Sequence, residues 1–320
     1  MRRGRSVGNP SRFAVSMISP NRILRRALWA VLFACAGTAY GAIRVVATTS
    51  DLKSLAEAIG GEKVEVEALV SPKTDPEEYQ PRPQDLARLK AAQMLVRVGV
   101  DFDLWVDRLA LQAANPAIRR GGAGHVDASY GITLLDVRGA QVGPSGGHAH
   151  GSGNPHYWLD PLNAEMITAS IMEALLRLDA PNAAYYQQRR TAFLAALHAR
   201  LSAWQQALAP LKGVAFIAYH NDWSYFARRF RLHIAGYIEP RPGVPPTPAH
   251  LAAIVNLARE RRVRAVLRQP HEPHIDADFV AARAGAAVVQ LAASVGAVGE
   301  ARDYLSLFDY NIATLAAFAR

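Results

Sequence analysis

The sequence predicts an α/β fold with two lobes, each a parallel sheet covered by helices, joined by a long rigid helix. Three observations predict it. Short apolar runs rich in β-branched residues alternate with segments of helical periodicity, and this series occurs twice. The runs are apolar throughout, which is typical of strands buried on both faces of a parallel sheet. A continuous helical segment separates the two series.

The first 41 residues have the composition of a secretory signal peptide. They contain seven arginines and no acidic residue, and an apolar run over 27–36 leads to Ala39-Tyr40-Gly41. The run is too short for a permanent membrane span. Translation from Met1 or from Met17 would produce such a signal. We therefore expect export to the periplasm and cleavage of residues 1–41.

Removal of this signal changes the charge and the cysteine content. Residues 42–320 keep 29 basic and 27 acidic residues, so the mature chain is nearly neutral and nothing indicates nucleic-acid binding. Cys35 is the only cysteine and lies inside the signal, so the exported chain forms no internal disulfide. Lipoprotein anchoring is less expected, because Phe33 is bulky for lipoprotein processing at Cys35.

The N-terminal lobe is expected over residues 42–182. Its apolar runs predict strands at 43–48, 64–70 and 94–99, and the segments between and after them predict helices at 52–59, 83–92 and 102–113. A further helix is expected to begin near Asn163.

The connecting helix is expected over 183–212, where apolar residues recur at steps of three and four with no Gly or Pro before Pro210. The C-terminal lobe follows over 213–320. Its pattern predicts strands at 214–219, 233–238, 263–267 and 287–291, and helices at 223–230, 248–261, 277–284 and 304–318.

Ligands of parallel sheets bind at the carboxyl ends of the strands, so polar residues at these ends are candidate site residues. His156 follows Asn154-Pro155 and precedes Asp160-Pro161, which restricts its backbone. His220, Asn221 and Asp222 follow the first strand of the second lobe, Glu239 the second and His271 the third. This mixture of nitrogen and oxygen donors is typical of a metal site.

The chain resembles the solute-binding proteins of the zinc/manganese family of ABC importers over essentially the whole mature chain. The matching motifs are Val45–Ser50, Asp75–Pro81 with Gln84-Asp85-Leu86, Arg97-Val98-Gly99, Asn154–Pro161, Tyr219-His220 with Tyr225-Phe226-Ala227, and Asp303-Tyr304 with Asn311-Ile312. The segment Asn-Pro-His-x-Trp-Leu-Asp-Pro is the most specific of them. The resemblance implies a divalent metal ion in the cleft between two lobes and delivery to a membrane permease.

The resemblance also implies the ligands. His156 and His220 match two of the family's histidine ligands, Glu77 stands where a histidine is usual, and Ala293 stands where many members have a last carboxylate. The fourth ligand is then water, Glu78, His271 or Glu239, of which Glu239 is the first choice because Pro240 and Gly243 constrain its segment.

Zinc is favoured over manganese or iron(II) as the cargo, because two histidines contribute and because His148 and His150 form a possible metal-capture loop. The expected partner is an ABC importer permease, and the chain is expected to be a monomer without enzymatic activity. Two alternatives remain. One is an exported metal-dependent hydrolase, although the chain has no His-Glu-x-x-His motif. The other is a diverged family member that binds a metal chelate or another small solute.

Overall fold

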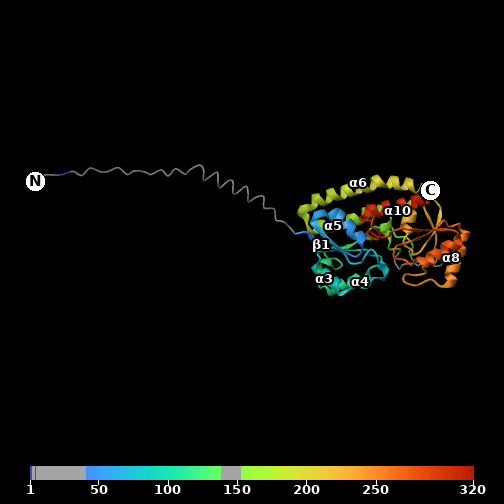
Figure 1. Ribbon diagram of the computed structural model, residues 1–320. Helices are drawn as coiled ribbons and strands as arrows, with labels where there is room; N and C mark the ends of the chain where they lie inside the picture. Colours follow the sequence, from blue (N-terminus) through green and yellow to red (C-terminus); the bar gives the residue numbers. More distant parts are fainter. Residues whose placement is uncertain (2–3, 5–40, 138–152) are drawn as a thin grey trace. The chain divides into compact units, whose positions relative to one another are not determined.

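The computed structural model describes residues 1, 4, 41–137 and 153–320. Residues 42–320 form two four-stranded sheets in which every strand pair is parallel. Helices cover the sheets (Figure 1). The predicted α/β class with two parallel sheets is confirmed. In the part of the chain that the structure describes, no helix is both long enough and apolar enough to cross a membrane.

The first sheet has the strand order β2-β1-β3-β4. Its strands are β1 (Ile43–Ala47), β2 (Val64–Ala68), β3 (Met94–Arg97) and β4 (His125–Asp127), and its helices are α2 (Ser50–Gly60), α3 (Pro83–Ala91) and α4 (Leu104–Gln112). Thr49 begins α2, because its side chain accepts a hydrogen bond from the backbone N–H of Leu52. Leu52, Leu55 and Ile59 share one face of α2 and are fully buried against the sheet.

The second sheet repeats this topology with the order β6-β5-β7-β8. Its strands are β5 (Ala215–Ala218), β6 (His233–Tyr237), β7 (Ala265–Arg268) and β8 (Ala287–Gln290), and the helices that accompany it are α7 (Ser224–Phe230), α8 (Pro248–Glu260), α9 (His274–Ala284) and α10 (Tyr304–Phe318). In both sheets the chain begins in a central strand, adds the edge strand on one side and then crosses to add the other two strands. Because all the strands are parallel, their carboxyl ends share one edge.

Two long helices lie between the sheets in sequence, α5 (Ala164–Leu178) and α6 (Ala183–Ala207). Figure 1 shows α6 passing along one side of the molecule above α5 and α10. Its buried residues Tyr186, Leu197 and Trp204 hold it in place, and the Trp204 Nε1 atom donates to Asp309 Oδ1 of α10 at 2.8 Å. The lobe boundaries at 182 and 212 stay predictions.

The molecule has two halves, one with the first sheet and α5 and the other with the second sheet and α10. Trp158 makes contacts between them. Its ring is buried, and its Nε1 atom donates to the carbonyl oxygen of Ala293 at 2.9 Å. Its own carbonyl oxygen accepts from the Tyr304 hydroxyl at 2.6 Å. Tyr157, the preceding residue, donates from its hydroxyl to the carbonyl oxygen of Val98 at 2.6 Å. The segment that follows His156 is therefore anchored to both halves of the molecule.

Candidate metal centre

His156 is held by its own loop. Asn154 Oδ1 accepts a hydrogen bond from the His156 backbone N–H at 2.9 Å and lies 3.1 Å from the ring atom Nδ1. The Asn154 side chain in turn donates to the carbonyl oxygen of Asn221 at 2.9 Å. The rings of Phe102 and Trp158 pack against the imidazole. These contacts fix the ring with Nδ1 toward Asn154 and Nε2 toward the interior of the site.

His220 follows β5 and is oriented from the opposite side. Its Nδ1 atom lies 2.5 Å from Glu239 Oε2. Glu239 follows β6, and its other oxygen accepts from the backbone N–H of Gly243 at 2.8 Å. Gly243 has φ of 68°, which a glycine adopts readily, and this turn brings its N–H to the carboxylate. Glu239 therefore fixes the ring through Nδ1 and leaves Nε2 directed toward the other half of the molecule.

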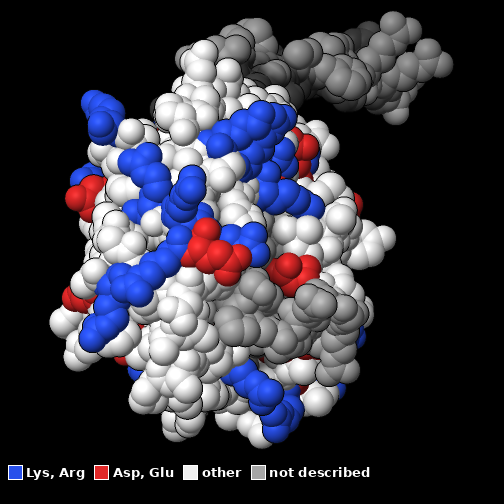
Figure 2. Space-filling model, turned by 90° about the vertical axis from the view of Figure 1, so that its right-hand side faces the viewer, with Lys and Arg blue, Asp and Glu red and all other residues white. Residues whose placement is uncertain are grey.

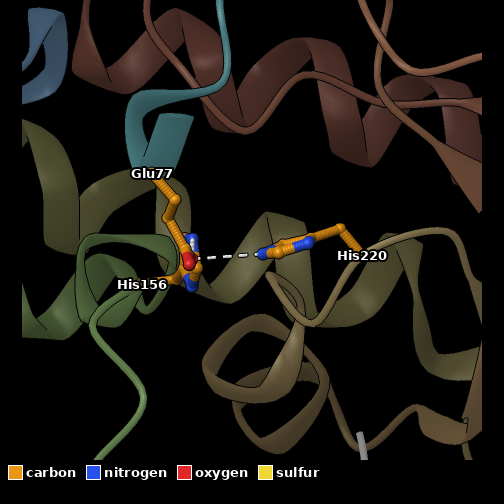
Figure 3. A group of neighbouring side chains, drawn as sticks. All are labelled: Glu77, His156 and His220. Carbon is orange, nitrogen blue, oxygen red and sulfur yellow. Dashed lines mark hydrogen bonds and ion pairs between the residues drawn. The ribbon is translucent and has the colours of Figure 1, made fainter. Parts of the chain in front are cut away.

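Glu77 connects the two histidines. It lies in a short 3₁₀ turn that Asp75 begins, with Asp75 Oδ1 accepting from the Glu77 backbone N–H at 2.8 Å. Its Oε1 atom lies 3.3 Å from His156 Nε2 and 3.2 Å from His220 Nε2 (Figure 3). Each of the three residues offers one ligand atom, and these atoms lie within 4.8 Å of one another.

Asp222 adds a second carboxylate. Its Oδ1 atom lies 3.0 Å from His156 Nε2 and 3.8 Å from His220 Nε2, and its side chain is 3% exposed. Its other oxygen accepts from Gln269 Nε2 at 2.6 Å. The sequence placed Asp222 at a strand end but gave no sign that it turns toward His156, because that contact depends on how the two halves pack.

Burial and charge act against each other in this cluster. Burial alone would lower the pKa of His220, but Asp222, Glu239 and Glu77 reverse the effect and hold this pKa well above its usual value. Burial raises the pKa of Asp222 to about 7, and the charge of His220 opposes this rise. Without a metal ion, protons therefore supply the positive charge that the buried carboxylates require.

The distances between the carboxylate oxygens and the two Nε2 atoms are compatible with a shared metal ion. Ligand atoms about 2.0 to 2.1 Å from a tetrahedral zinc ion are roughly 3.3 to 3.4 Å apart. The contacts of Glu77 and Asp222 with the two Nε2 atoms span 3.0–3.8 Å and bracket that value. The two carboxylates also supply the two negative charges that balance a divalent cation, and the two imidazoles add neutral nitrogen ligands.

The other candidates lie apart from this cluster. The Ala293 side chain offers no ligand atom, and its carbonyl oxygen is bound by Trp158. His271 and Glu78 line a neighbouring hollow of about 330 Å³, together with Glu239. Among the described residues the mutually close group contains Glu77, His156 and His220 alone, and Asp222 approaches it through the two Nε2 atoms, whereas no contact of His271 or Glu78 with either Nε2 atom is observed. His148 and His150 lie outside the described residues.

Comparison with known proteins shows similarity over most of the chain. A family model described as the periplasmic component A of zinc-uptake complexes, ZnuA, matches residues 45–318. The high-affinity zinc uptake system protein ZnuA of Bacillus subtilis (strain 168) is 24% identical over 283 residues, which are 85% of this chain and 86% of that protein. The iron-binding protein YfeA of Yersinia pestis is 24% identical over 284 residues, 85% of each chain.

A third relative and a solved structure extend the comparison. The manganese ABC transporter substrate-binding lipoprotein PsaA of Streptococcus pneumoniae is 22% identical over 223 residues, covering 69% of this chain and 70% of that protein. A crystal structure of ZnuA superposes with a TM-score of 0.73 at 27% identity and covers 87% of this chain and 100% of its own. The names of these relatives refer to three different metals.

Proposed function

Since the chain belongs to the family of periplasmic A components of zinc-uptake complexes, we propose that it captures one divalent metal ion and delivers it to the permease of an ABC importer. One observation carries this proposal. Histidines from separate halves of the molecule direct their Nε2 atoms at the same oxygen of Glu77, at 3.3 and 3.2 Å. Two imidazole nitrogens that meet at one carboxylate offer a divalent ion three ligand atoms of the kind that zinc prefers.

The proposed ligands are Glu77, His156, His220 and Asp222. Asp222 takes the fourth place, for which Glu239 was the first choice from sequence, because its Oδ1 atom approaches both Nε2 atoms. Glu239 instead contacts Nδ1 of His220, on the far side of the ring. Two carboxylates balance the charge of one divalent ion, so the occupied site is electrically neutral.

Zinc is the proposed cargo. A site of two imidazoles and two carboxylate oxygens accommodates four-coordinate zinc, and with nitrogen and oxygen donors zinc binds more tightly than manganese or iron(II). Octahedral manganese would need two further ligands, for which this cluster offers only second carboxylate oxygens. One of these, Asp222 Oδ2, is already bound by Gln269.

Release follows from the origin of the ligands. Glu77 and His156 belong to the first half of the chain, and His220 and Asp222 to the second. A small separation of the halves would therefore divide the ligands into two pairs and weaken the site without unfolding either sheet. We expect the permease to stabilise that separated state.

Export is part of the proposal. Residues 1–41 direct the chain out of the cytoplasm and are then cleaved, which leaves a mature protein of residues 42–320 in the periplasm. A cleaved signal is favoured here over a lipid anchor because of Phe33 at the processing site.

The test is elemental analysis of protein purified without chelators, followed by zinc, manganese and iron(II) titration of the stripped form. We expect one ion per chain and zinc the tightest. His156→Ala and His220→Ala should each weaken binding by at least 100-fold, because each removes a ligand and exposes buried carboxylates to one another.

The control is His198→Ala, since His198 is half exposed and pairs with Glu165 on the outer surface. It should bind like the native protein. Wild-type protein that takes up no ion at millimolar concentrations, or three histidine variants that lose affinity equally, would contradict the proposed site.

A further inference from the structure

The amino ends of the second sheet form a surface opposite the metal centre. Because β6, β5, β7 and β8 are parallel, the turns that lead into them all lie at one edge. Backbone hydrogen bonds join these turns: the Gly213 N–H donates to the Arg231 carbonyl at 2.8 Å, and the Ala287 N–H donates to the Arg264 carbonyl at 3.1 Å. Side chains on the turns therefore belong to one continuous surface.

This surface is strongly basic. We call it the basic edge, and its members are the exposed residues Lys212, Arg231, Arg259, Arg261, Arg262, Arg264 and Arg283. Glu260 is the one acidic residue on the same turns. Figure 2 looks onto the end of the molecule where α8 lies in Figure 1 and shows Lys and Arg side chains outnumbering Asp and Glu over the upper part of this face. Outside the basic edge and Glu260, residues 42–320 contain 22 basic and 26 acidic residues. The basic edge therefore has a positive net charge, whereas the rest of these residues together have a negative one.

The charges of the basic edge are not neutralised within the described part of the chain. Among its seven members, Arg261 has the one acidic partner there, Glu260 at 3.5 Å, and both side chains are more than half exposed. The guanidinium groups of Arg264 and Arg283 lie over the rings of Phe318 and Phe279, with Cζ 5.2 and 3.8 Å from the ring centroids. A cation over an aromatic face keeps its charge, and both side chains remain exposed to solvent.

Backbone conformation indicates that the turns themselves do not require arginine at positions 231 and 262. Gly213 and Gly285 have φ of 75° and 69°, the left-handed conformation that glycine favours. Arg231 and Arg262 adopt the same conformation, with φ of 58° and 51°. A side chain there costs about 1–2 kcal/mol, and a cation at a helix end returns roughly 0.3–1 kcal/mol. Folding alone would be served better by glycine at both positions.

The basic edge has many charges and no large exposed hydrophobic side chain, and this composition indicates the kind of partner that it binds. Protein interfaces usually have an apolar or aromatic centre. The large hydrophobic side chains that are exposed in the described residues all lie outside the basic edge, at Met1, Leu104, Leu111, Tyr130, Val137, Met166, Val244 and Ile275. A surface with one ion pair among seven cations in the described part of the chain, and without an exposed apolar anchor, matches a layer of lipid phosphates, where each Lys or Arg adds to the attraction.

We propose that the basic edge binds the headgroups of anionic phospholipids and holds the protein at the membrane surface. This proposal goes beyond metal capture and does not depend on it, because the metal centre lies at the carboxyl ends of the same strands. A protein bound in this way would reach its permease by diffusing along the bilayer, and its metal-binding residues would face away from the lipid.

The experiment is co-sedimentation of purified residues 42–320 with vesicles of neutral phosphatidylcholine, with and without about 30% phosphatidylglycerol, at low and physiological salt. We expect binding to the anionic vesicles alone, weakened by salt because the attraction is screened. The variant Arg231→Gly/Arg262→Gly should bind roughly 30-fold more weakly, from the contribution of two cations. Its melting temperature should be unchanged or higher, and its metal stoichiometry unchanged.

The matched control is Lys90→Gln/Arg108→Gln, which removes the same charge from exposed positions on α3 and α4 of the first sheet. It should bind vesicles like the native protein. Equal losses in the two double variants would attribute binding to net charge and overturn the proposal. Native protein that does not sediment with anionic vesicles at low salt would overturn it as well.

Discussion

At the scale of single residues, the two carboxylates near His220 contact different nitrogen atoms of its ring. Asp222 approaches the Nε2 atoms of both histidines, whereas Glu239 contacts Nδ1 of His220 alone. A group that supplies a ligand atom and a group that orients a ligand affect metal binding to different degrees, since outer partners change affinity by about 10- to 100-fold. Replacing each carboxylate by its amide therefore tells them apart.

We expect Asp222→Asn to weaken zinc binding by more than 100-fold and Glu239→Gln by about 10-fold. The reason is that the first change removes a charged ligand, whereas the second keeps an acceptor for the Nδ1 proton. Competition titration with a zinc chelator measures both. The reverse order of effects would restore Glu239 as the fourth ligand.

The raised pKa of His220 gives a second prediction. Burial would lower this pKa, but the facing Asp222, Glu239 and Glu77 hold it well above its usual value, so the metal-free ring keeps its proton at neutral pH. A metal ion must displace that proton. Zinc affinity should therefore continue to rise between pH 6.5 and 8, and calorimetry in two buffers should show proton release at pH 7.5. Affinity that is constant above pH 6.5 would contradict the arrangement.

At the scale of elements, α2 is linked to the segment after β8 by one buried carboxyl group. Asp51, in the first turn of α2, accepts from the Val295 backbone N–H at 2.9 Å with one oxygen, and its other oxygen has no partner among the described residues. Burial raises the pKa of Asp51 to about 7 from a usual 3.8, although hydrogen bonds from Val295 and its neighbours oppose the rise. This contact joins the two halves of the molecule.

The raised pKa means that Asp51 destabilises the ionised fold. Between about pH 4 and 7 the folded state holds a proton that the unfolded state has lost, so stability falls as pH rises through this range. Asp51→Asn should remove this loss and gain up to roughly 4 kcal/mol at pH 8 compared with pH 4, by the conversion of a three-unit shift. Thermal melts of metal-free protein at several pH values measure it.

The control for Asp51 is Glu300→Gln, an exposed carboxylate on the segment after β8 that Asp51 contacts. Its melting temperature should follow that of the native protein at every pH. Parallel curves for Asp51→Asn and the native protein would show that Asp51 is ionised at little cost.

Elements also show how far the sequence alone determined the fold. The apolar runs located seven of the strands to within a few residues, since a buried parallel strand is apolar along its whole length. The strand β4, His125–Asp127, was not predicted, because three residues with two polar side chains carry no such signal. Its register against β3 depends on backbone bonds such as that from Leu95 N–H to the Gly124 carbonyl at 2.9 Å.

The site divides in a similar way. Glu77, His156 and His220 stand in motifs and at strand ends, so the sequence could select them. Asp222 could not be selected, because its contact with His156 crosses 66 residues and depends on the packing of the two halves. The orienting contact of Glu239 also required the structure, since sequence cannot show which ring nitrogen a carboxylate faces.

At the scale of the whole molecule, charge is distributed in opposite senses on the two edges of the second sheet. The amino edge carries the seven cations described above. Near the carboxyl edge, a hollow of about 330 Å³ is lined by Asp75, Glu78, Glu239, Glu272 and Asp276, with no lysine or arginine among the lining residues. Glu239 also contacts His220, so this hollow adjoins the metal centre.

A hollow of this charge should attract cations to the site before they are bound. Fields of this kind raise association rates by about 10- to 1,000-fold, and salt reduces the effect. We therefore expect the association rate of zinc to fall as ionic strength increases. The variant Glu78→Gln/Asp276→Asn should slow association several-fold and leave dissociation unchanged, because neither residue is a proposed ligand. Stopped-flow measurement with a fluorescent zinc indicator separates the two rates.

The control Glu65→Gln/Glu173→Gln removes the same charge from exposed positions on β2 and α5 and should leave both rates unchanged. If the Glu78/Asp276 variant instead raises the dissociation rate, these carboxylates hold the ion directly and the ligand set must be extended toward the hollow.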